Sequence, residues 1–341
     1  MLSLNMVNLI QFGTASIAVL GLLMLWRQPS FRGVAVLIGL IALASLINLF
    51  EDTGLTRNIY LISPIFVMLF GPASYLATKH LVLGQLSRHD YWHLLPAVPF
   101  LLFTEYVQWV IAAGSVWRLI YAGMTAMLLV QFKRIMDAER SDSDDYSLNW
   151  LFWLVLVTAG FNFVDLVRLN SQHMISHQLN VLGQGINNGI WLVATGFIVY
   201  KLANQGPIPQ PVANSKVDEQ PSPKKLEADQ YQSIFAELDQ LFVGNQWFLT
   251  PRLTLAEVAE LTGIQSRDIS RAINTVAQKS FNEYVNNYRV EFVCHQLQQN
   301  VSQSLTDIAL AAGFSSKASF NQVFKQSMGV TPSAYKAQQQ V

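Results

Sequence analysis

The first 200 residues alternate between long apolar runs and short polar breaks. A helix that crosses the hydrocarbon core of a bilayer needs about 20 mainly apolar residues. Seven runs of about this length carry few or no charged side chains, at roughly 4–26, 33–50, 58–78, 92–113, 117–136, 149–169 and 180–200. The pattern predicts a transmembrane domain of about seven helices over residues 1–202. The fifth run is the weakest, because only 14 residues separate Arg118 from Lys133, and both side chains must extend to the interfaces.

The apolar periodicity stops between residues 203 and 225. This stretch holds five of the chain's 12 prolines: Pro207, Pro209, Pro211, Pro221 and Pro223. A polar, proline-rich composition is typical of a flexible or semi-extended linker. A coil of this length has an end-to-end distance of roughly 25 Å, so we expect the following domain to stay close to the membrane.

Helical periodicity returns in residues 226–341, beginning with an amphipathic helix over 227–243. An internal repeat follows: TLAEVAELTGI at 254–264 and SLTDIALAAGF at 304–314. Each copy begins with a hydroxyl residue and a carboxylate three positions later, the arrangement of a helix N-terminal capping pair. Each copy ends in a glycine, Gly263 or Gly313, which suits a tight turn, and a second helix follows. The repeat predicts two helix-turn-helix units, at about 254–276 and 304–327.

These segments resemble the C-terminal domain of AraC/XylS-family transcription regulators. The resemblance covers residues 250–337 and includes LTLAEVAELTGIQSRDISRAIN, KSFNEYVNNYRVE and SLTDIALAAGFSSKASFNQVFKQSMGVTPSAYK. Its most specific residues are Gly313, Phe314, Ser319, Phe320, Phe324, Lys325, Gly329, Thr331, Pro332 and Tyr335. The resemblance implies one connecting helix at about 281–298 and recognition helices near 266–276 and 316–327. GPASYLATKHL and WHLLPAVPFLLF carry a weaker resemblance to the seven-span region of membrane-bound members.

The recognition helices suggest which side chains meet DNA. The candidates are Ser266, Arg267, Ser270 and Arg271 in the first helix, and Lys317, Ala318, Asn321 and Gln322 in the second. Arginine can form two hydrogen bonds with guanine, and asparagine or glutamine can do the same with adenine. The apolar positions Ile269, Ile273, Phe320 and Phe324 should hold each helix on its core. The alternative for the two arginines is a solvated surface charge.

The charge of the predicted DNA-binding domain is low. Residues 250–341 carry 8 Lys/Arg and 6 Asp/Glu, a net of +2. Family members often have arginine where this chain has Gln322, and a second basic residue where it has Gln326. Contacts with phosphates supply most non-specific affinity, so we expect modest DNA binding by a monomer and a homodimer on the promoter.

Three ionisable residues of the membrane half are candidates for signal sensing: Glu105, Asp165 and Arg168. Glu105 falls in the fourth predicted span, and the other two fall in the sixth. A charge inside the membrane costs at least about 2.5 kcal/mol, so it suggests a function. Asp165 and Arg168 are three positions apart on one helix face and can pair. The alternative is an ion pair that only holds helices together.

The distribution of basic residues predicts the orientation of the membrane domain. With the N-terminus outside, the cytoplasmic loops hold eight Lys/Arg residues, and the external loops hold Arg57, Arg118 and Arg168. Cytoplasmic loops of membrane proteins are enriched in Lys and Arg. An odd number of spans then places the C-terminal domain in the cytoplasm. The expected location is the inner (cytoplasmic) membrane, in multi-pass form.

Composition agrees with an all-α membrane protein. Apolar residues make up 51% of the 341 residues and charged residues 13%, against roughly 25% charged in soluble domains. The single cysteine, Cys294, excludes a disulfide within the chain. No nucleophile–base set or cluster of metal ligands is visible, so we expect no enzyme activity, no metal and no cofactor.

The sequence therefore predicts a membrane-anchored, sequence-specific transcription regulator. We expect a one-component sensor that couples an external or intramembrane signal, a small molecule or a protein, to promoter binding. The partners would be double-stranded DNA, the lipid bilayer and RNA polymerase, and the resemblance favours activation over repression. In the alternative, the spans only anchor and dimerise a constitutive regulator.

Overall fold

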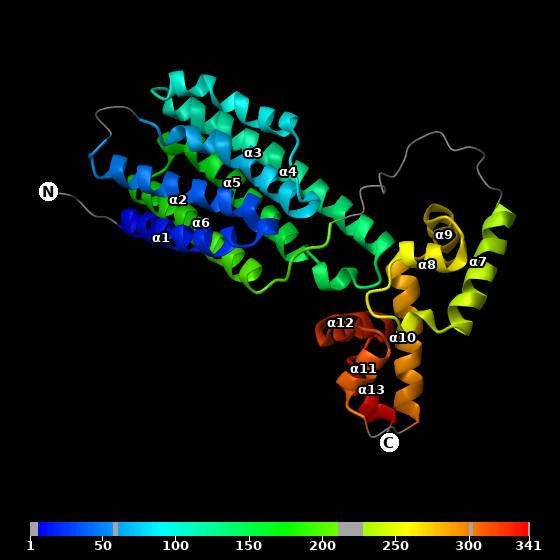
Figure 1. Ribbon diagram of the computed structural model, residues 1–341. Helices are drawn as coiled ribbons and strands as arrows, with labels where there is room; N and C mark the ends of the chain where they lie inside the picture. Colours follow the sequence, from blue (N-terminus) through cyan, green and yellow to red (C-terminus); the bar gives the residue numbers. More distant parts are fainter. Residues whose placement is uncertain (1–5, 57–60, 211–227, 300–302, 340–341) are drawn as a thin grey trace. The chain divides into compact units, whose positions relative to one another are not determined.

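The computed structural model describes residues 6–56, 61–210, 228–299 and 303–339 (Figure 1). These residues form helices and no β-strand, with one isolated bridge between Arg140 and Thr254. The chain divides into two compact units. Unit 1 contains residues 1–130 and 148–210, and unit 2 contains residues 131–147 and 211–341. Most of the predicted linker, 211–225, lies outside the described residues.

Unit 1 is a bundle of long α-helices. They are α1 (Met6–Trp26), α2 (Arg32–Asp52), α3 (Pro64–Leu83), α4 (Val107–Glu139), α5 (Asn149–Asn170) and α6 (His177–Ala203). The last residues of α4, from 131 onwards, belong to unit 2. Helix α1 packs against α2 and α6, α2 also packs against α3, and α5 packs against α6. Small residues allow these close approaches, because a Cβ added at Gly21 of α1 would collide with Val199 of α6.

The prediction of one α-helix over the fourth span, 92–113, is wrong. Residues 88–103 form two 3₁₀ helices, η2 (Arg88–Ala97) and η3 (Pro99–Phe103), and α4 begins only at Val107. Pro96 and Pro99 explain the change, because proline lacks the N–H that an α-helix requires and disfavours α conformation in the residue before it. Glu105 consequently lies in the exposed turn between η3 and α4, and not within a helix.

The lengths and apolar character of the helices only partly match the predicted spans. Five stretches of the described residues are long and apolar enough to cross a bilayer: Met6–Trp26, Pro29–Asp52, Pro64–Leu83, Val107–Glu139 and Ser143–Asn170. Helix α6, which contains the predicted run 180–200, is not among them. Its first half carries Asn180, Gln184, Asn187 and Asn188, which lower its hydropathy.

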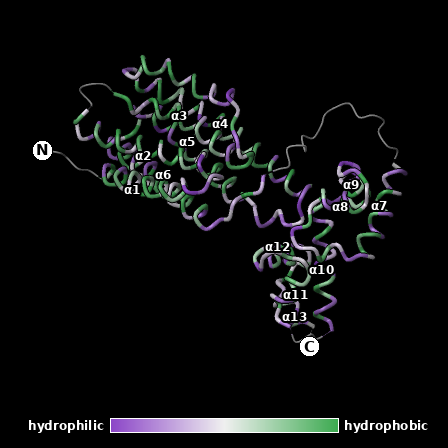
Figure 2. The backbone as a smooth tube through the Cα atoms, viewed as in Figure 1, coloured by the Kyte–Doolittle hydropathy of each residue, from purple (hydrophilic) through white to green (hydrophobic). Residues whose placement is uncertain are grey.

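The surface of unit 1 is strongly apolar. Large apolar side chains point outward, such as Phe12, Trp109 and Trp153, which are 57%, 77% and 63% exposed. Figure 2 shows hydrophobic residues along all of the long helices of this unit, whereas the helices of unit 2 alternate between hydrophobic and hydrophilic residues. Soluble monomers rarely expose apolar surface on this scale.

Unit 2 consists of shorter helices. After the 3₁₀ helix η4 (Ser143–Tyr146) come α7 (Ala228–Gly244), η6 (Trp247–Leu249), α8 (Leu255–Thr262), α9 (Ser266–Ala272), the π-helical turn η7 (Ile273–Ala277), α10 (Phe281–Gln298), α11 (Leu305–Ala311), α12 (Lys317–Met328) and α13 (Pro332–Gln339). Helix α10 has the range predicted for the connecting helix. Its side chains enter two separate hydrophobic cores.

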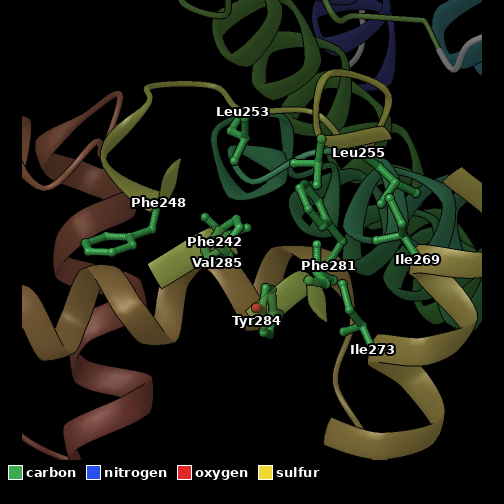
Figure 3. Packing of buried hydrophobic residues seen from close by; sticks show 11 residues of the cluster. Phe242, Phe248, Leu253, Leu255, Ile269, Ile273, Phe281, Tyr284 and Val285 are labelled. Atoms are coloured by element: carbon green, nitrogen blue, oxygen red, sulfur yellow. The ribbon is translucent and has the colours of Figure 1, made fainter. Parts of the chain in front are cut away.

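The first core gathers side chains from α7, α8, α9 and the first half of α10 (Figure 3). Phe242, Ile269 and Val285 in this core are fully buried. The second core combines the second half of α10 with α11 and α12, where Val293 and Phe324 are fully buried. Two helix pairs, α8–α9 and α11–α12, are therefore each held on α10 by a core of their own.

Candidate DNA-binding interface

The first helix pair begins with the predicted capping pair. Thr254 Oγ1 accepts a hydrogen bond from the Glu257 N–H at 3.2 Å, and Glu257 Oε2 accepts one from the Thr254 N–H at 2.7 Å. Both bonds satisfy N–H groups that the helix itself leaves without a partner. Gly263 ends α8 with a φ of +70°, and α9 begins three residues later. The local sequence therefore determines where α8 begins and where it ends.

The second helix pair repeats this arrangement with a longer turn that packs against other backbone. Ser304 Oγ accepts from the Asp307 N–H at 3.1 Å at the start of α11. Gly313 follows α11 with a φ of +90°, and a Cβ there would lie 2.8 and 2.7 Å from the carbonyl oxygens of Phe248 and Leu249. Ser316 then caps α12, because its Oγ accepts from the Ser319 N–H at 3.0 Å. Only glycine can occupy position 313 without moving this backbone.

The candidate DNA-contact residues lie on the outward faces of α9 and α12. On α12, all four candidates are exposed: Lys317, Ala318, Asn321 and Gln322. On α9, Arg267 is exposed, whereas Ser266, Ser270 and Arg271 are partly exposed. The opposite faces carry Ile269 and Phe320, which are buried. The Arg267 Nε lies 3.4 Å from Asp268 Oδ1, a distance at which an exposed ion pair contributes little.

A buried arginine that the sequence analysis did not single out lies on the connecting helix α10. Arg289 of α10 is 1% exposed, and its Nε and Nη2 donate at 2.8 Å to the carbonyl oxygens of Phe248 and Thr250. Its Nη2 also donates to Ser141 Oγ at 3.1 Å. Burial lowers the pKa of Arg289 to about 10, so the guanidinium is still charged at neutral pH. These bonds compensate a buried charge that would otherwise be costly.

The segment of residues 140–146, between α4 and α5, also contacts unit 2 helices. Asp145 accepts hydrogen bonds from the hydroxyls of Ser315 and Ser316 at 2.5 and 2.7 Å, and Asp144 Oδ1 lies 3.4 Å from Gln322 Nε2. Burial raises the pKa of Asp144, and the charge of nearby Lys133 acts in the opposite direction. The sequence analysis singled out no residue of this segment. The available signal was its three aspartates within four residues, at 142, 144 and 145.

The predicted pairing of Asp165 with Arg168 is confirmed. The Arg168 Nε donates to Asp165 Oδ1 at 2.8 Å, and Arg168 also donates to Asn180 Oδ1. Asn187 Nδ2 lies 3.4 Å from Asp165 Oδ2. Since Asn180 and Asn187 belong to α6, the pair connects α5 to α6. The structure does not bring Glu105 into this network, because Glu105 is exposed in its turn.

Arg118 does not extend to an interface as the sequence suggested. Its Nε donates to Asn162 Oδ1 at 3.1 Å, and its guanidinium lies 5.1 Å from the ring centroid of Trp191. These residues line a cavity of about 100 Å³ within unit 1, together with apolar side chains such as Phe70 and Leu154.

Among the residues that the structure describes, no group of three His, Cys, Asp or Glu side chains could hold a metal ion.

The C-terminal part of the chain is similar to known proteins. Residues 258–338 match a helix-turn-helix domain family. The chain is 32% identical to the HTH-type transcriptional activator AarP of Providencia stuartii over 104 residues, which are 30% of this chain and 74% of AarP. A solved structure of a protein of unknown function from Listeria innocua is 25% identical, covers 29% of this chain and 92% of its own, and has a TM-score of 0.27. That TM-score supports no structural argument.

Proposed function

Because this chain belongs to the AraC family of DNA-binding transcription regulators, we propose that it is a membrane-anchored member that reads promoter DNA with α9 and α12. The observation that carries the proposal is the two-faced character of these helices. Each carries polar side chains outward and a buried apolar residue, Ile269 or Phe320, inward. Each follows a capped helix and a turn with a positive-φ glycine. Two helix-turn-helix units on one connecting helix can enter successive major-groove segments.

Five of the eight candidate residues fall into two chemical groups. Arg267, Arg271 and Lys317 supply positive charge for phosphates or guanine, whereas Asn321 and Gln322 can form paired hydrogen bonds with adenine. The net charge of +2 over residues 250–341 favours binding as a homodimer, because two linked sites raise the apparent affinity by roughly 10² to 10⁴. The name of the relative AarP includes activator, which supports activation of transcription here too.

The apolar exterior of unit 1 supports insertion into a membrane. Only 6% of the residues in the most apolar stretch of Ser143–Asn170 are buried within the protein. A lipid environment would cover the side chains that point outward. The excess of Lys and Arg in alternate loops supports an external N-terminus. We therefore place the protein in the inner membrane, with unit 2 in the cytoplasm where the DNA is.

The segment 88–103 is compatible with a seventh crossing. It runs alongside α3 in the opposite direction, since Asp90 pairs with Lys79 near one end and Ala97 packs with Phe66 and Ile65 near the other. At about 2.0 Å per residue, a 3₁₀ helix over these residues would reach roughly 32 Å, comparable to the hydrocarbon core. A crossing here also places the end of α4, and residues 140–147, on the cytoplasmic side.

We assign the sensing role to the polar network between α5 and α6. The Asp165–Arg168 pair and its bonds to Asn180 hold the two helices at a fixed distance, so a signal that disturbs these bonds would change the helix packing. The alternative is a constitutive regulator with membrane helices that only anchor and dimerise it. In that case Glu105→Gln and Asp165→Asn would leave promoter activity unchanged.

The test of DNA recognition uses the full chain in lipid nanodiscs. Genome-wide mapping of bound DNA first supplies a target fragment. Arg271→Ala and Lys317→Ala should each weaken binding to that fragment by about 5- to 150-fold, corresponding to about 1–3 kcal/mol for a specific contact. Lys336→Ala on α13 removes the same charge outside both recognition helices and should change the affinity little. Unchanged affinity in both recognition-helix variants would refute the assignment.

A further inference from the structure

The cytoplasmic segment 140–146 packs on the DNA-binding helices in two parts. The first part is Ser141, which is 2% exposed. Its carbonyl oxygen accepts from Asn282 Nδ2 at 3.0 Å and Asn286 Nδ2 at 3.3 Å, and its N–H donates to the Leu253 carbonyl oxygen at 3.0 Å. These bonds, with those from Arg289, make Ser141 an anchor built into unit 2.

The second part is the pair of carboxylates that follow the anchor. Asp145 takes both of its hydrogen bonds from Ser315 and Ser316, directly before α12. Asp144 approaches Gln322, one turn further along the same helix. Unlike Ser141, both aspartates are only partly buried. They can therefore leave this surface without unfolding the anchor.

The surface that the carboxylates occupy is the one that DNA requires. The N-terminal end of a helix carries free N–H groups and a partial positive charge, which favour an anion such as a carboxylate or a phosphate. Ser316 caps that end of α12, and the DNA-contact candidates Lys317 and Gln322 lie on the same helix. A phosphate group approaching this end would meet Asp145 in its place.

Charge complementarity points to the same competition. Residues 140–146 contain Arg140 and three aspartates, a net of −2, which equals in size the net of +2 over residues 250–341. Because neutralisation of phosphates supplies most non-specific affinity, a docked segment of this charge opposes the attraction of residues 250–341 to DNA.

We propose that Asp144 and Asp145 are an intramolecular competitor that covers the second helix-turn-helix unit until a signal releases them. The inference rests on the proposed DNA-binding function. The segment continues directly from α4 and leads through η4 into α5, so a change in the packing of either membrane helix pulls on the anchor. Release of the two carboxylates frees the start of α12 for DNA, and the covalent connection needs no diffusing messenger.

The first experiment compares two double variants of the full chain in lipid nanodiscs. Asp144→Ala with Asp145→Ala should tighten binding to the mapped promoter fragment by about tenfold, a change of about 1.4 kcal/mol. Asp229→Ala with Glu237→Ala removes the same charge from the exposed face of α7 and should change the affinity less than about twofold. The proposal is overturned if both double variants tighten binding equally, or if the Asp144/Asp145 variant does not tighten it.

The second experiment fixes the contact between Asp145 and Ser316 with a disulfide bond. Asp145→Cys with Ser316→Cys, in a Cys294→Ser background, should cross-link on oxidation. The oxidised protein should lose at least about tenfold in affinity, and a reductant should restore it, which a folding defect would not allow. Failure to cross-link overturns the proposal, as does unchanged affinity after cross-linking. If the pair cross-links but the unmodified protein binds no duplex, the DNA-binding function itself is refuted.

Discussion

Gly263 and Gly313 have the same left-handed backbone but different surroundings. The space around Gly263 is open, whereas a Cβ at Gly313 would meet two backbone carbonyl oxygens of residues 248 and 249. The first position requires glycine for its φ alone. The second requires it also because the α11–α12 turn touches η6. The same type of turn therefore has a second, packing role in one copy of the repeat.

We predict that the two glycines differ in their tolerance of alanine. Gly263→Ala should cost about 1–2 kcal/mol, the strain of a left-handed residue with a side chain. Gly313→Ala should cost more, because the backbone of η6 or of the turn must move as well. Amide hydrogen exchange in the lipid-embedded chain would measure the difference, in α8 and α9 for the first variant and in α11 and α12 for the second. Equal protection in the two variants would show that the contact with η6 is unimportant.

At the scale of elements, α7 extends the DNA-binding domain beyond the matched range of 258–338. Leu238 and Phe242 of this helix are fully buried in the first core. The ring centroids of Phe242 and Tyr284 lie 5.0 Å apart. The Tyr284 hydroxyl donates a hydrogen bond to Asp239 Oδ1 at 2.9 Å. Burial is the largest cause that raises the pKa of the Tyr284 hydroxyl, so this donor stays protonated. Helix α7 is thus a structural part of the first core, which holds α8 and α9.

Phe242→Ala should therefore destabilise the first helix pair by about 3–5 kcal/mol, the usual cost of removing a buried phenylalanine. The readout is faster hydrogen exchange in α8 and α9, with weaker DNA binding as a consequence. Glu237→Ala, on the exposed side of α7, is the control and should leave the exchange unchanged. Wild-type protection in the Phe242 variant would mean that α7 does not support this core.

At the scale of the whole molecule, the number of crossings decides which loops face the cytoplasm. We predict that Glu105→Cys and Gln172→Cys, in a Cys294→Ser background, react with a membrane-impermeant maleimide in intact cells whose outer surface is accessible. Gln28→Cys should react only after the membrane is permeabilised. The reason is the proposed crossing at 88–103, which moves the next turn outside. If position 105 is protected from the maleimide, segment 88–103 does not cross the membrane, and α4 has the opposite orientation.

Local signals in the sequence determined much of the secondary structure of the DNA-binding half. Capping pairs, glycines and apolar periodicity act between residues three or four apart, so Thr254 with Glu257, and Ser304 with Asp307, could be read directly. The run of apolar residues likewise predicted α1, α2, α3 and α5. The eight DNA-contact candidates came from the family resemblance, and their outward placement agrees with it, although their roles stay predictions.

Tertiary structure alone decided the contacts between distant parts of the chain. Asp145 and Ser315 are 170 positions apart, and Ser141 and Arg289 are 148 apart. Hydrogen bonds over such separations leave no period or spacing in a sequence, because they depend on how independently formed helices pack. The inward turn of Arg118 toward Asn162 has the same origin. Local chemistry thus placed the helices, and packing decided which polar groups meet on them.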